Sequence, residues 1–499
     1  IGFYAEKFLA WGLMGKPQEK TFADKRVRGQ ALRQLRKQIG SEPICTDSAA
    51  LKVASLDAAR IPHMPEAIIR PRGDADIAAV LRLANKHRVP VTTRGAGSAA
   101  TGATTPIHGG WVLDLSAWNK IRIDAVSGYA YVEAGAINAK VNAAAERRGW
   151  FFPPDPSSKN YCTIGGNIAC NAGGLRAAKY GVTRDYVVAL EGFLPTGEPV
   201  KWGLPLKKYV SGHNLRDLWI GAEGTLGVIT RATLKLIPKP EARTTFLAAY
   251  ADEGKALRTV KAILKERLQP AICEFLDRQT VSCFLKKHAA AGTLKILPFR
   301  IENINTPPSV LLLELDGDAG QVRRLQREAK ALLSDKALWL KHARTPEEAE
   351  ALWHIRRTSS QAMFQLGDTK LNEDIVVPLE AQRSLLRYTL ELKRKTGLAT
   401  PTFGHAADGN FHIHVMFNWD DAEQRAQAKE TIDLMMRRVV ELGGAITGEH
   451  GIGLAKSPYL RLQHSEAEIA AMLAIKDALD PNGILNPGKI FEPFDIWEQ

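Results

Sequence analysis

The alternation of apolar and polar positions predicts a stretch of α/β structure in the first half of the chain. Residues 66–70 and 89–93 have the short apolar runs of buried strands, and residues 74–87 between them carry apolar side chains at helical spacing. A further apolar strand is predicted at 111–115, and a β-rich run covers 227–237. A strand, a helix and a second strand in this order predict parallel pairing with a helical crossover.

The same alternation returns after Pro238 and Pro240, which mark a boundary. This second pattern predicts a separate sheet with helices on one face. After residue 430 the sequence predicts a helix, a histidine-bearing loop at 447–453, another helix and a tail rich in proline and glycine. The predicted strands and helices of the second sheet are, in chain order, 246–250, 253–267, 310–315 and 321–333.

The first 37 residues have a composition of their own. Residues 1–15 are loosely amphipathic and rich in aromatic side chains, and residues 16–37 hold eight basic side chains against Glu19 and Asp24. A helix packed on its own domain is the favoured interpretation. The alternative is an element that docks on an anionic membrane surface or on a partner subunit.

Composition limits the class of protein. At about 100–200 residues per domain, 499 residues predict two to four domains. Hydrophobic residues at 45% and charged residues at 24% are ordinary for a soluble globular protein and exclude disordered and collagen-like chains. The net charge of +13 suits anionic substrates, membranes or partners. Nucleic acid is not expected, because zinc-finger spacing, RNP-like aromatic runs and long basic blocks are absent from the sequence.

Cysteine usage and hydropathy bear on the compartment. The five cysteines form no C-x-x-C pair, which argues against a disulfide framework and against an iron–sulfur or zinc-thiolate site. No apolar run in the sequence reaches the roughly 20 residues that span a bilayer. These features predict a reducing, cytoplasmic compartment. Because the sequence begins with Ile, a removed signal stays open.

Three glycine-rich loops lie within the first half. The segment RGAGSAATG (94–102) follows a predicted strand, and glycines let backbone N–H groups approach phosphate oxygens. Its Gly95-x-Gly97-x-x-Ala100 spacing fits the dinucleotide fingerprint, with Asp114 19 residues on. The continuation TGATTP is a poor helix start, so we predict a phosphate-binding loop that is not a Rossmann turn. Loops at 153–174 and 221–229 strengthen this reading against that of ordinary turns.

The segments RGAGSAATG, PPDPSS, IGGNIACNAGGLRAAKYG and GAEGTLGVIT resemble the FAD-binding domain of the vanillyl-alcohol oxidase / p-cresol methylhydroxylase superfamily. The resemblance implies an α+β fold: a two-part FAD-binding domain of the p-cresol methylhydroxylase type and a C-terminal substrate (cap) domain with an antiparallel sheet and helices. The implied division is an N-terminal extension over 1–45, the FAD-binding domain over 46–240, the cap over 241–430, and a segment over 431–499 that returns to the FAD domain.

The resemblance also implies the cofactor and its contacts. Some members attach the flavin to a His near the first loop; none stands there in this chain, so we expect non-covalent FAD. Loop 94–102 would hold the pyrophosphate, and the tail LDPNGILNPGKIF (479–491) would bring Asn486 near the flavin. The expected FAD-binding residues are Arg94, Gly95, Ala96, Gly97, Ser98, Thr101, Gly102, Pro154, Asp155, Ser158, Gly165, Gly166, Asn167, Ala169, Asn171, Glu223, Gly227, Val228, Ile229 and Asn486.

A histidine constellation lies in the second half, in GHAADGNFHIH (404–414) and GEHGIG (448–453). Two His and a Glu are suitable ligands for a divalent metal, and a neighbouring His can act as a base near neutral pH. A single His is more often a structural hydrogen-bonding group, but four with a Glu on two glycine-flanked loops favour a functional site.

The constellation resembles the C-terminal domain of FAD-linked oxidases, which occurs in D-lactate dehydrogenases, the catalytic subunit of glycolate oxidase and D-2-hydroxyglutarate dehydrogenase. It implies His405, His412 and Glu449 as metal ligands and His450 as the base. Zinc is the expected metal, with manganese and iron as alternatives. Many members have Asn at the position of His414 and Gly at that of Ala407, so whether His414 joins the metal is open.

A third segment, LWHIRRTSS (352–360), carries a candidate substrate clamp. An Arg here suits bidentate binding of a carboxylate, and the alternative is an Arg on a helix surface. The resemblance implies that Arg356 grips the carboxylate of a 2-hydroxy acid, supported by Ser360. Hydroxyglutarate-specific members carry a Lys where Asn372 stands, with Lys370 two residues earlier here, which favours a small monocarboxylate.

The resulting hypothesis is an FAD-dependent dehydrogenase that oxidises D-lactate or glycolate to the 2-oxo acid, with hydride passing to flavin N5, the hydroxyl proton to His450 and a metal assisting. The alternatives are the same scaffold acting on D-2-hydroxyglutarate, an alditol or an alkylglycerone phosphate, and a non-catalytic flavin-binding subunit. Electrons would leave for an external acceptor: an iron–sulfur subunit, electron-transfer flavoprotein, quinone or cytochrome. Residues 1–37 are the candidate docking element. They would place the protein at the inner face of a membrane, which in a eukaryote would be a mitochondrial membrane.

Overall fold

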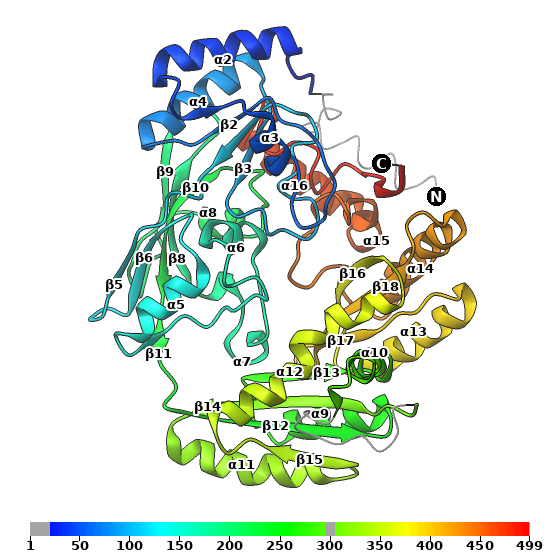
Figure 1. Ribbon diagram of the computed structural model, residues 1–499. Helices are drawn as coiled ribbons and strands as arrows, with labels where there is room; N and C mark the ends of the chain where they lie inside the picture. The colour runs from blue at the N-terminus through cyan, green and yellow to red at the C-terminus, as the bar shows by residue number, and fades with distance from the viewer. Residues whose placement is uncertain (1–19, 295–304, 499) are drawn as a thin grey trace.

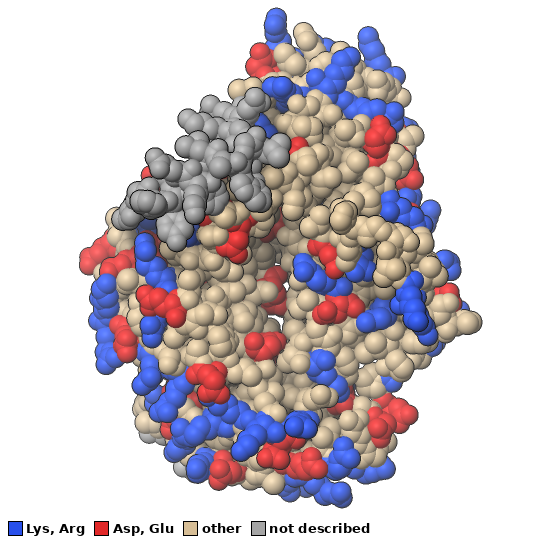
Figure 2. Space-filling model, turned by 180° about the vertical axis from the view of Figure 1, so that it is seen from behind, with Lys and Arg blue, Asp and Glu red and all other residues tan. Residues whose placement is uncertain are grey.

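The computed structural model describes residues 20–294 and 305–498. Figure 1 shows two regions, a first domain at the upper left and a cap at the lower right, with the C-terminal helices between them. On the face drawn in Figure 2, Lys and Arg lie interspersed with Asp and Glu. Within the described residues, no helix combines the length and the apolar character that crossing a membrane requires.

The first domain begins with a four-stranded sheet in the order β1-β2-β4-β3. Strands β2, β4 and β3 are parallel, and α4 makes the crossover from β2 to β3. The predicted helix over 74–87 is confirmed, and its residues Ile77, Val80 and Leu81 are buried. The bounds are β1 Ile44–Cys45, β2 Ala67–Ile69, α4 Asp74–His87, β3 Val91–Arg94 and β4 Trp111–Asp114.

Helix α2 (Lys25–Ile39) lies along α4 at the edge of this domain (Figure 1). Asp24 caps its N-terminus, and Ala31, Leu32 and Leu35 are buried in the core that α4 also lines. Packing on its own domain is therefore confirmed for residues 25–39. Residues 1–19, with the predicted amphipathic segment, lie outside the described residues.

The second part of the first domain is an antiparallel sheet in the order β5-β6-β10-β8-β9. Helices α5 and α6 pack against it, and the short strands β7 and β11 pair beside it. The bounds are β5 Ile121–Asp124, β6 Tyr129–Glu133, α5 Asn138–Glu146, β7 Trp150–Phe151, α6 Ile164–Cys170, β8 Val187–Phe193, β9 Pro199–Gly203, α8 Leu215–Trp219, β10 Val228–Lys235 and β11 Ile237–Pro238.

The cap is built on a seven-stranded antiparallel sheet in the order β15-β12-β14-β13-β17-β18-β16. The predicted strands at 246–250 and 310–315 are the neighbouring strands β12 and β14, each longer than expected. The bounds are β12 Ala242–Tyr250, β13 Ile272–Leu276, β14 Ser309–Gly317, β15 Trp339–His342, β16 Thr369–Val376, β17 Thr402–His405 and β18 Asn410–Phe417.

Helices cover both faces of the cap sheet, so the expectation of helices on one face is wrong. Phe246 and Ala248 belong to the core under one set of helices, and Leu247 and Ala249 belong to the core under the other. Every residue of this run is buried because both faces of β12 are covered, as a continuous apolar run requires. Helices α9 Glu253–Lys265, α11 Ala319–Ser334, α13 Gln382–Thr396 and α14 Ala422–Glu441 cover one face, and α10 Arg278–Ala290 and α12 Pro346–Ala362 the other.

The C-terminal segment leaves the cap and returns to the first domain. The division expected at 430/431 falls inside α14, whose Ile432 and Met435 lie in the cap core. After the loop 447–454 and helices α15 (Leu460–Gln463) and α16 (Glu466–Leu479), the tail lies beside β3, where Val91 exchanges backbone hydrogen bonds with Ile484 and Asn486. The tail thus closes the first domain.

Candidate active site

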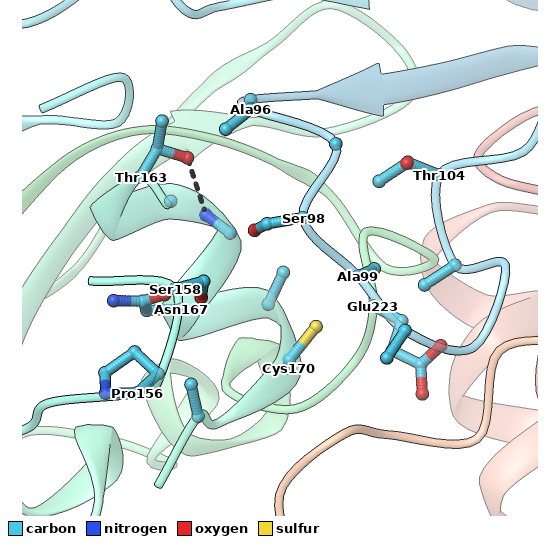
Figure 3. A pocket seen from close by; sticks show the side chains of 18 of the residues that line it. Ala96, Ser98, Ala99, Thr104, Pro156, Ser158, Thr163, Asn167, Cys170 and Glu223 are labelled. Carbon is cyan, nitrogen blue, oxygen red and sulfur yellow. Dashed lines mark hydrogen bonds between the residues drawn. The ribbon is translucent and has the colours of Figure 1, made fainter. Parts of the chain in front are cut away.

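A cavity of about 450 Å³ lies in the first domain between the loop after β3 and helix α6 (Figure 3). The loop after β3 continues without a helix, which confirms that it is not a Rossmann turn. Most of the residues expected to bind FAD line this cavity: Arg94, Gly95, Ala96, Gly97, Ser98, Ser158, Gly165, Gly166, Asn167, Ala169, Glu223, Gly227 and Ile229.

The walls of this cavity fit a large ligand with polar edges. A Cβ on Gly95 would lie 2.2 Å from Thr163 Oγ1, and one on Gly165 would lie 2.8 Å from the Cβ of Ala134, so bare backbone is needed for the loop to close on α6. The Nδ2 atom of Asn167 is buried without a hydrogen-bond partner among the described residues. A bound dinucleotide would offer hydrogen-bond partners to this unpaired buried donor and to the exposed backbone of the preformed cavity.

Seven residues expected at the cofactor do not line this cavity: Thr101, Gly102, Pro154, Asp155, Asn171, Val228 and Asn486. They hold the surrounding segments instead. The carbonyl of Thr101 accepts hydrogen bonds from Leu454 and Ala455, and the Asn486 amide donates to the carbonyls of Ala103 and Glu223. Thr101 and Asn486 therefore join the cavity loops to the C-terminal segment.

A second cavity, of about 580 Å³, opens between the first domain and the cap. It holds every residue expected at the metal and the substrate: Arg356, Ser360, His405, His412, His414, Glu449 and His450. The two cavities share Pro156 and Ser157 of the first domain, and Asn372, Glu449 and His450. The predicted base and one predicted metal ligand therefore stand where the first cavity meets the second.

Strand geometry brings the cap residues of this site to one face of the sheet. Strands β17 and β18 pair so that Phe403 is opposite His412, and β18 and β16 pair so that His412 is opposite Asp374. Side chains two apart on a strand share a face. His405, His414, Asn372 and Lys370 therefore join these residues on the face that α12 also covers.

The predicted metal ligands converge. The Nε2 atoms of His405 and His412 lie 3.8 Å and 3.6 Å from Glu449 Oε1. A cation about 2.0–2.2 Å from each atom sets ligand atoms roughly 3–3.5 Å apart, so closing by a few tenths of an ångström would bind one. The group of potential ligand atoms within 4.8 Å of one another contains these three residues and not His414, whose Nδ1 lies 3.2 Å from the Pro401 carbonyl.

The protonation of His405 and His414 follows from their partners. His405 Nδ1 donates to the carboxylate of Glu274, and its Nε2 faces Glu449. Burial opposes the charge on the imidazole, but these two carboxylates raise the pKa of His405 well above its usual value. Burial lowers the pKa of His414 to about 3, with Lys370 adding to the effect. His414 is therefore a neutral, buried imidazole beside the cluster.

Asp374 organises the loop that carries Glu449 and His450. Its Oδ2 accepts the backbone N–H groups of Gly448, Glu449 and His450 at 2.8, 2.7 and 3.0 Å, and its Oδ1 accepts the amide of Asn410. Burial opposes ionisation, yet the charges of His450, Lys456 and His412 keep the pKa of Asp374 well below its usual range. An ionised aspartate from the cap thus holds the loop in place.

Glu223 holds the same loop from the first domain. Its carboxylate accepts the backbone N–H groups of Ile452 and Gly453 at 2.7 and 2.8 Å. Burial raises the pKa of Glu223 to about 7. Glu223 borders the first cavity, but its carboxylate is hydrogen-bonded to the loop 447–454.

Arg356 and Ser360 stand one helical turn apart on α12. The guanidinium of Arg356 donates through Nε to Glu274 and lies 3.9 Å above the ring of Phe403. Lys370 Nζ donates to Ser360 Oγ at 2.5 Å, and burial lowers the pKa of Lys370. Among the described residues, Lys370 has no carboxylate partner in ion-pair distance.

The sequence motifs did not reveal Glu274, Asp374, Lys456 or Phe403. Glu274 lies in the apolar strand β13 with no local motif, and only its register opposite His405 brings it to the site. Lys456, 3% exposed, bonds to the carbonyls of Asp374 and Ile446. Of these four, Asp374 has a local signal, because it is the second of the two acidic residues in the segment EDIVVP (373–378).

Two known protein families match consecutive parts of the chain. Residues 65–203 match the family described as FAD binding domain, and residues 239–490 match the C-terminal domain of FAD linked oxidases. The glycolate oxidase subunit GlcD of Bacillus subtilis (strain 168) is 39% identical over 455 residues, 91% of this chain and 94% of that protein. The D-lactate dehydrogenase of Anaerostipes hadrus is 35% identical over 435 residues, covering 85% of this chain and 89% of the relative.

Solved structures agree on the fold. The crystal structure of p-cresol methylhydroxylase with substrate bound superposes with a TM-score of 0.77 at 16% identity, covering 94% of this chain and 98% of that one. The expected α+β fold of the p-cresol methylhydroxylase type is confirmed. The chain belongs to the family of FAD-linked oxidases, which join an FAD-binding domain to a C-terminal oxidase domain.

Proposed function

We propose that this protein oxidises a small D-2-hydroxy acid, D-lactate or glycolate, to the 2-oxo acid with non-covalent FAD. The observation that carries the proposal is the junction of the two cavities at Asn372, Glu449 and His450. A small acid at this junction would touch a base, a cation-binding cluster and the cofactor cavity together. The names of the two relatives point to the same substrate class.

Each residue has a role that its surroundings support. Arg356 would bind the substrate carboxylate through its terminal nitrogens, which form no hydrogen bond to another described residue. His450 would take the hydroxyl proton, because it stands at the junction and its backbone is held by Asp374. Ser360 would support the carboxylate, oriented by Lys370. When bound, FAD accepts the hydride from C2 of the substrate.

The cluster of His405, His412 and Glu449 would hold a divalent cation, with zinc favoured by two imidazoles and a carboxylate and with manganese and iron as alternatives. Such a cation would supply Lewis-acid polarisation of the 2-hydroxyl group. The cluster borders the substrate cavity, which supports a catalytic rather than a purely structural ion.

The electron acceptor is external in this proposal. The five cysteines are free, with Cys162, Cys273 and Cys283 buried, so the chain offers no built iron–sulfur relay. An iron–sulfur subunit, an electron-transfer flavoprotein, a quinone or a cytochrome would therefore receive the electrons.

The test is anaerobic reduction of the bound flavin. Adding D-lactate or glycolate to the holoprotein should bleach the visible flavin absorbance, and L-lactate should not. H450N should keep its FAD and reduce the flavin about 10²–10⁴ times more slowly, the usual contribution of a positioned base. Unchanged absorbance with both acids would refute the proposal, and an H450N rate equal to that of the wild type would refute the role of His450.

A second candidate substrate is D-2-hydroxyglutarate, and the observation that favours it is Lys370. Lys370 lines the first cavity and donates to Ser360, which lines the second, and it has no acidic partner among the described residues, so a second carboxylate of the substrate would reach it at the junction. In the same assay, D-2-hydroxyglutarate should then reduce the flavin faster than D-lactate, and K370M should reverse this order. Faster reduction by D-lactate in the wild type would exclude the second candidate.

A further inference from the structure

One buried carboxylate joins the predicted metal site to the predicted substrate clamp. Glu274 on β13 has no exposed surface, and its two oxygens have different partners. Oε1 accepts from Nδ1 of His405, and Oε2 accepts from Nε of Arg356. These partners lie 131 and 82 residues away in the sequence.

The bridge determines which atoms of Arg356 remain available. Glu274 engages Nε, and Phe403 covers one face of the guanidinium. The two terminal nitrogens are the donors left for a ligand in the cavity. A guanidinium held at Nε and at its face presents this pair in one orientation, as bidentate binding of a carboxylate requires.

The same bridge orients His405. A carboxylate only accepts hydrogen bonds, so Nδ1 of His405 must carry a proton, and a bound cation would take the place of a proton at Nε2. Nε2 faces Glu449 Oε1, where the second imidazole also converges. Carboxylates that hold a ligating imidazole in this way make it a stronger metal ligand.

We propose that Glu274 is a positioning residue that couples cation binding at His405, His412 and Glu449 to binding of the substrate carboxylate at Arg356. The inference rests on the proposed function and adds a linkage between its two halves. A cation bound at Nε2 of His405 would fix this imidazole while its Nδ1–H donates to Glu274, and the carboxylate held in this way would keep Arg356 aligned. By thermodynamic reciprocity, an anion on Arg356 then tightens binding of the cation.

An ion pair that only stabilises the fold is the competing explanation. Glu314 provides a matched control, because it is a buried glutamate on the adjacent strand β14, opposite Ile272 of β13, and accepts a hydrogen bond from Thr245. Glu314 also lines the second cavity, but no hydrogen bond or ion pair joins it to His405 or Arg356, so E314Q changes a buried glutamate of the same sheet and cavity without breaking the bridge. Loss of fold stability alone should appear in both E274Q and E314Q.

The experiment uses holoprotein with FAD bound, zinc as the cation and oxalate as the anion. Zinc content and zinc affinity are measured for wild type, E274Q, E274D and E314Q. Oxalate affinity is then measured from the perturbation of flavin absorbance, with and without zinc. The ratio of the two oxalate dissociation constants is the coupling factor.

We expect zinc to tighten oxalate binding in the wild type and in E314Q. E274Q should lose about 10- to 100-fold in zinc affinity, as expected for loss of an imidazole's carboxylate partner, and its coupling factor should fall towards one. E274D keeps the charge but is one methylene shorter, so it cannot reach both partners and should not restore the coupling. Steady-state assays should show a raised KM for the hydroxy acid in E274Q.

Each outcome bears on a different claim. Wild-type affinities and coupling in E274Q would overturn the role of Glu274, as would full restoration of coupling by E274D. Equal losses in E274Q and E314Q would assign Glu274 a structural role. If the wild type reduces its flavin with D-lactate but binds no zinc, the coupling and the metal site are both wrong. If it binds zinc and shows the coupling but its flavin is not reduced, only the proposed reaction is wrong.

Discussion

At the scale of single residues, three buried carboxylates organise this site. Glu274, Asp374 and Glu223 each accept hydrogen bonds from groups that carry the proposed chemistry or from the loop that presents it. Burial would raise the pKa of Glu274, but His405 and Arg356 lower it to about 2. Removing one partner of such a buried pair leaves an uncompensated charge, which is more costly than loss of the pair itself.

Gly95 offers a test of the cofactor cavity at this scale. In G95A the new methyl group would meet Thr163 Oγ1, so the loop must move away from α6. Overpacking of this kind costs about 1–3 kcal/mol, and we expect FAD affinity to fall by roughly 5- to 150-fold. FAD binding to the apoprotein, followed by flavin fluorescence, measures this change.

G73A is the matched control, because a Cβ on Gly73 meets no atom within 4 Å. Gly95 is absent from the positions with positive φ, so an effect of G95A reports packing rather than backbone strain. Equal FAD affinity in G95A and the wild type would show that this loop does not close on the cofactor cavity through α6.

At the scale of elements, the loop 447–454 connects the cap to the first domain. Asp374 at the cap sheet and Glu223 in the first domain hold its two halves, and Thr101 accepts hydrogen bonds from its end. The loop thus keeps Glu449 and His450 at the junction although it contains three glycines. This glycine-rich segment is held in one position because six of its eight backbone N–H groups, those of residues 448–450 and 452–454, have an assigned acceptor.

Glu223 makes this arrangement sensitive to pH. Its pKa of about 7 lies above the usual value near 4.5, so the folded protein holds this proton more tightly than the unfolded chain. As pH rises from about 4.5 to 7, the unfolded chain ionises first and the free energy of unfolding falls, by at most about 1.4 kcal/mol per pH unit. E223Q should lose this part of the pH dependence.

The measurement is the apparent Tm of the holoprotein across this range of pH. The difference between E223Q and wild type should grow in favour of E223Q as pH rises. E198Q, which changes an exposed glutamate, should follow the wild type at every pH. Parallel Tm profiles for E223Q and wild type would contradict the raised pKa.

At the scale of the whole molecule, the site exists because the chain crosses twice between its domains. The cap follows the first domain, and the C-terminal segment then returns past the junction to β3. Lys179 and Tyr180 of α7 (Ala177–Tyr180) bind Asp316 on β14 and hold the cap against the first domain. Both cavities therefore depend on the relative position of the two domains.

The N-terminus gives a prediction at this scale. Deleting residues 1–37 would remove most of α2 and expose the face of α4 that Leu32 and Leu35 cover, each worth about 1.5–3 kcal/mol of burial. We expect that truncation to lower the Tm and the FAD content. Deletion of residues 1–19 should preserve the Tm and dye-linked activity, and impaired electron delivery to the physiological acceptor would support a docking role for this segment. Equal loss of dye-linked activity in both truncations would contradict the expectation that residues 1–19 are not needed for the fold.

Much of the local structure could be predicted because it depends on neighbours in the sequence. Helix α4 follows from its apolar spacing, and the absence of a Rossmann turn follows from TGATTP after the glycine loop. The two faces of the cap sheet could not be separated in the same way. A run such as Phe246–Tyr250 is apolar at every position, so its period does not show which helices cover which side.

The candidate site divides along the same line. The amino-acid sequence by itself determined the residue types of the proposed site, because His405, His412, Glu449 and His450 stand in short glycine-flanked motifs. Only the tertiary structure decided that Glu274 would bridge His405 and Arg356 and that Asp374 would hold the loop. Such contacts depend on strand order and register across the sheet, and no spacing along the chain encodes these directly.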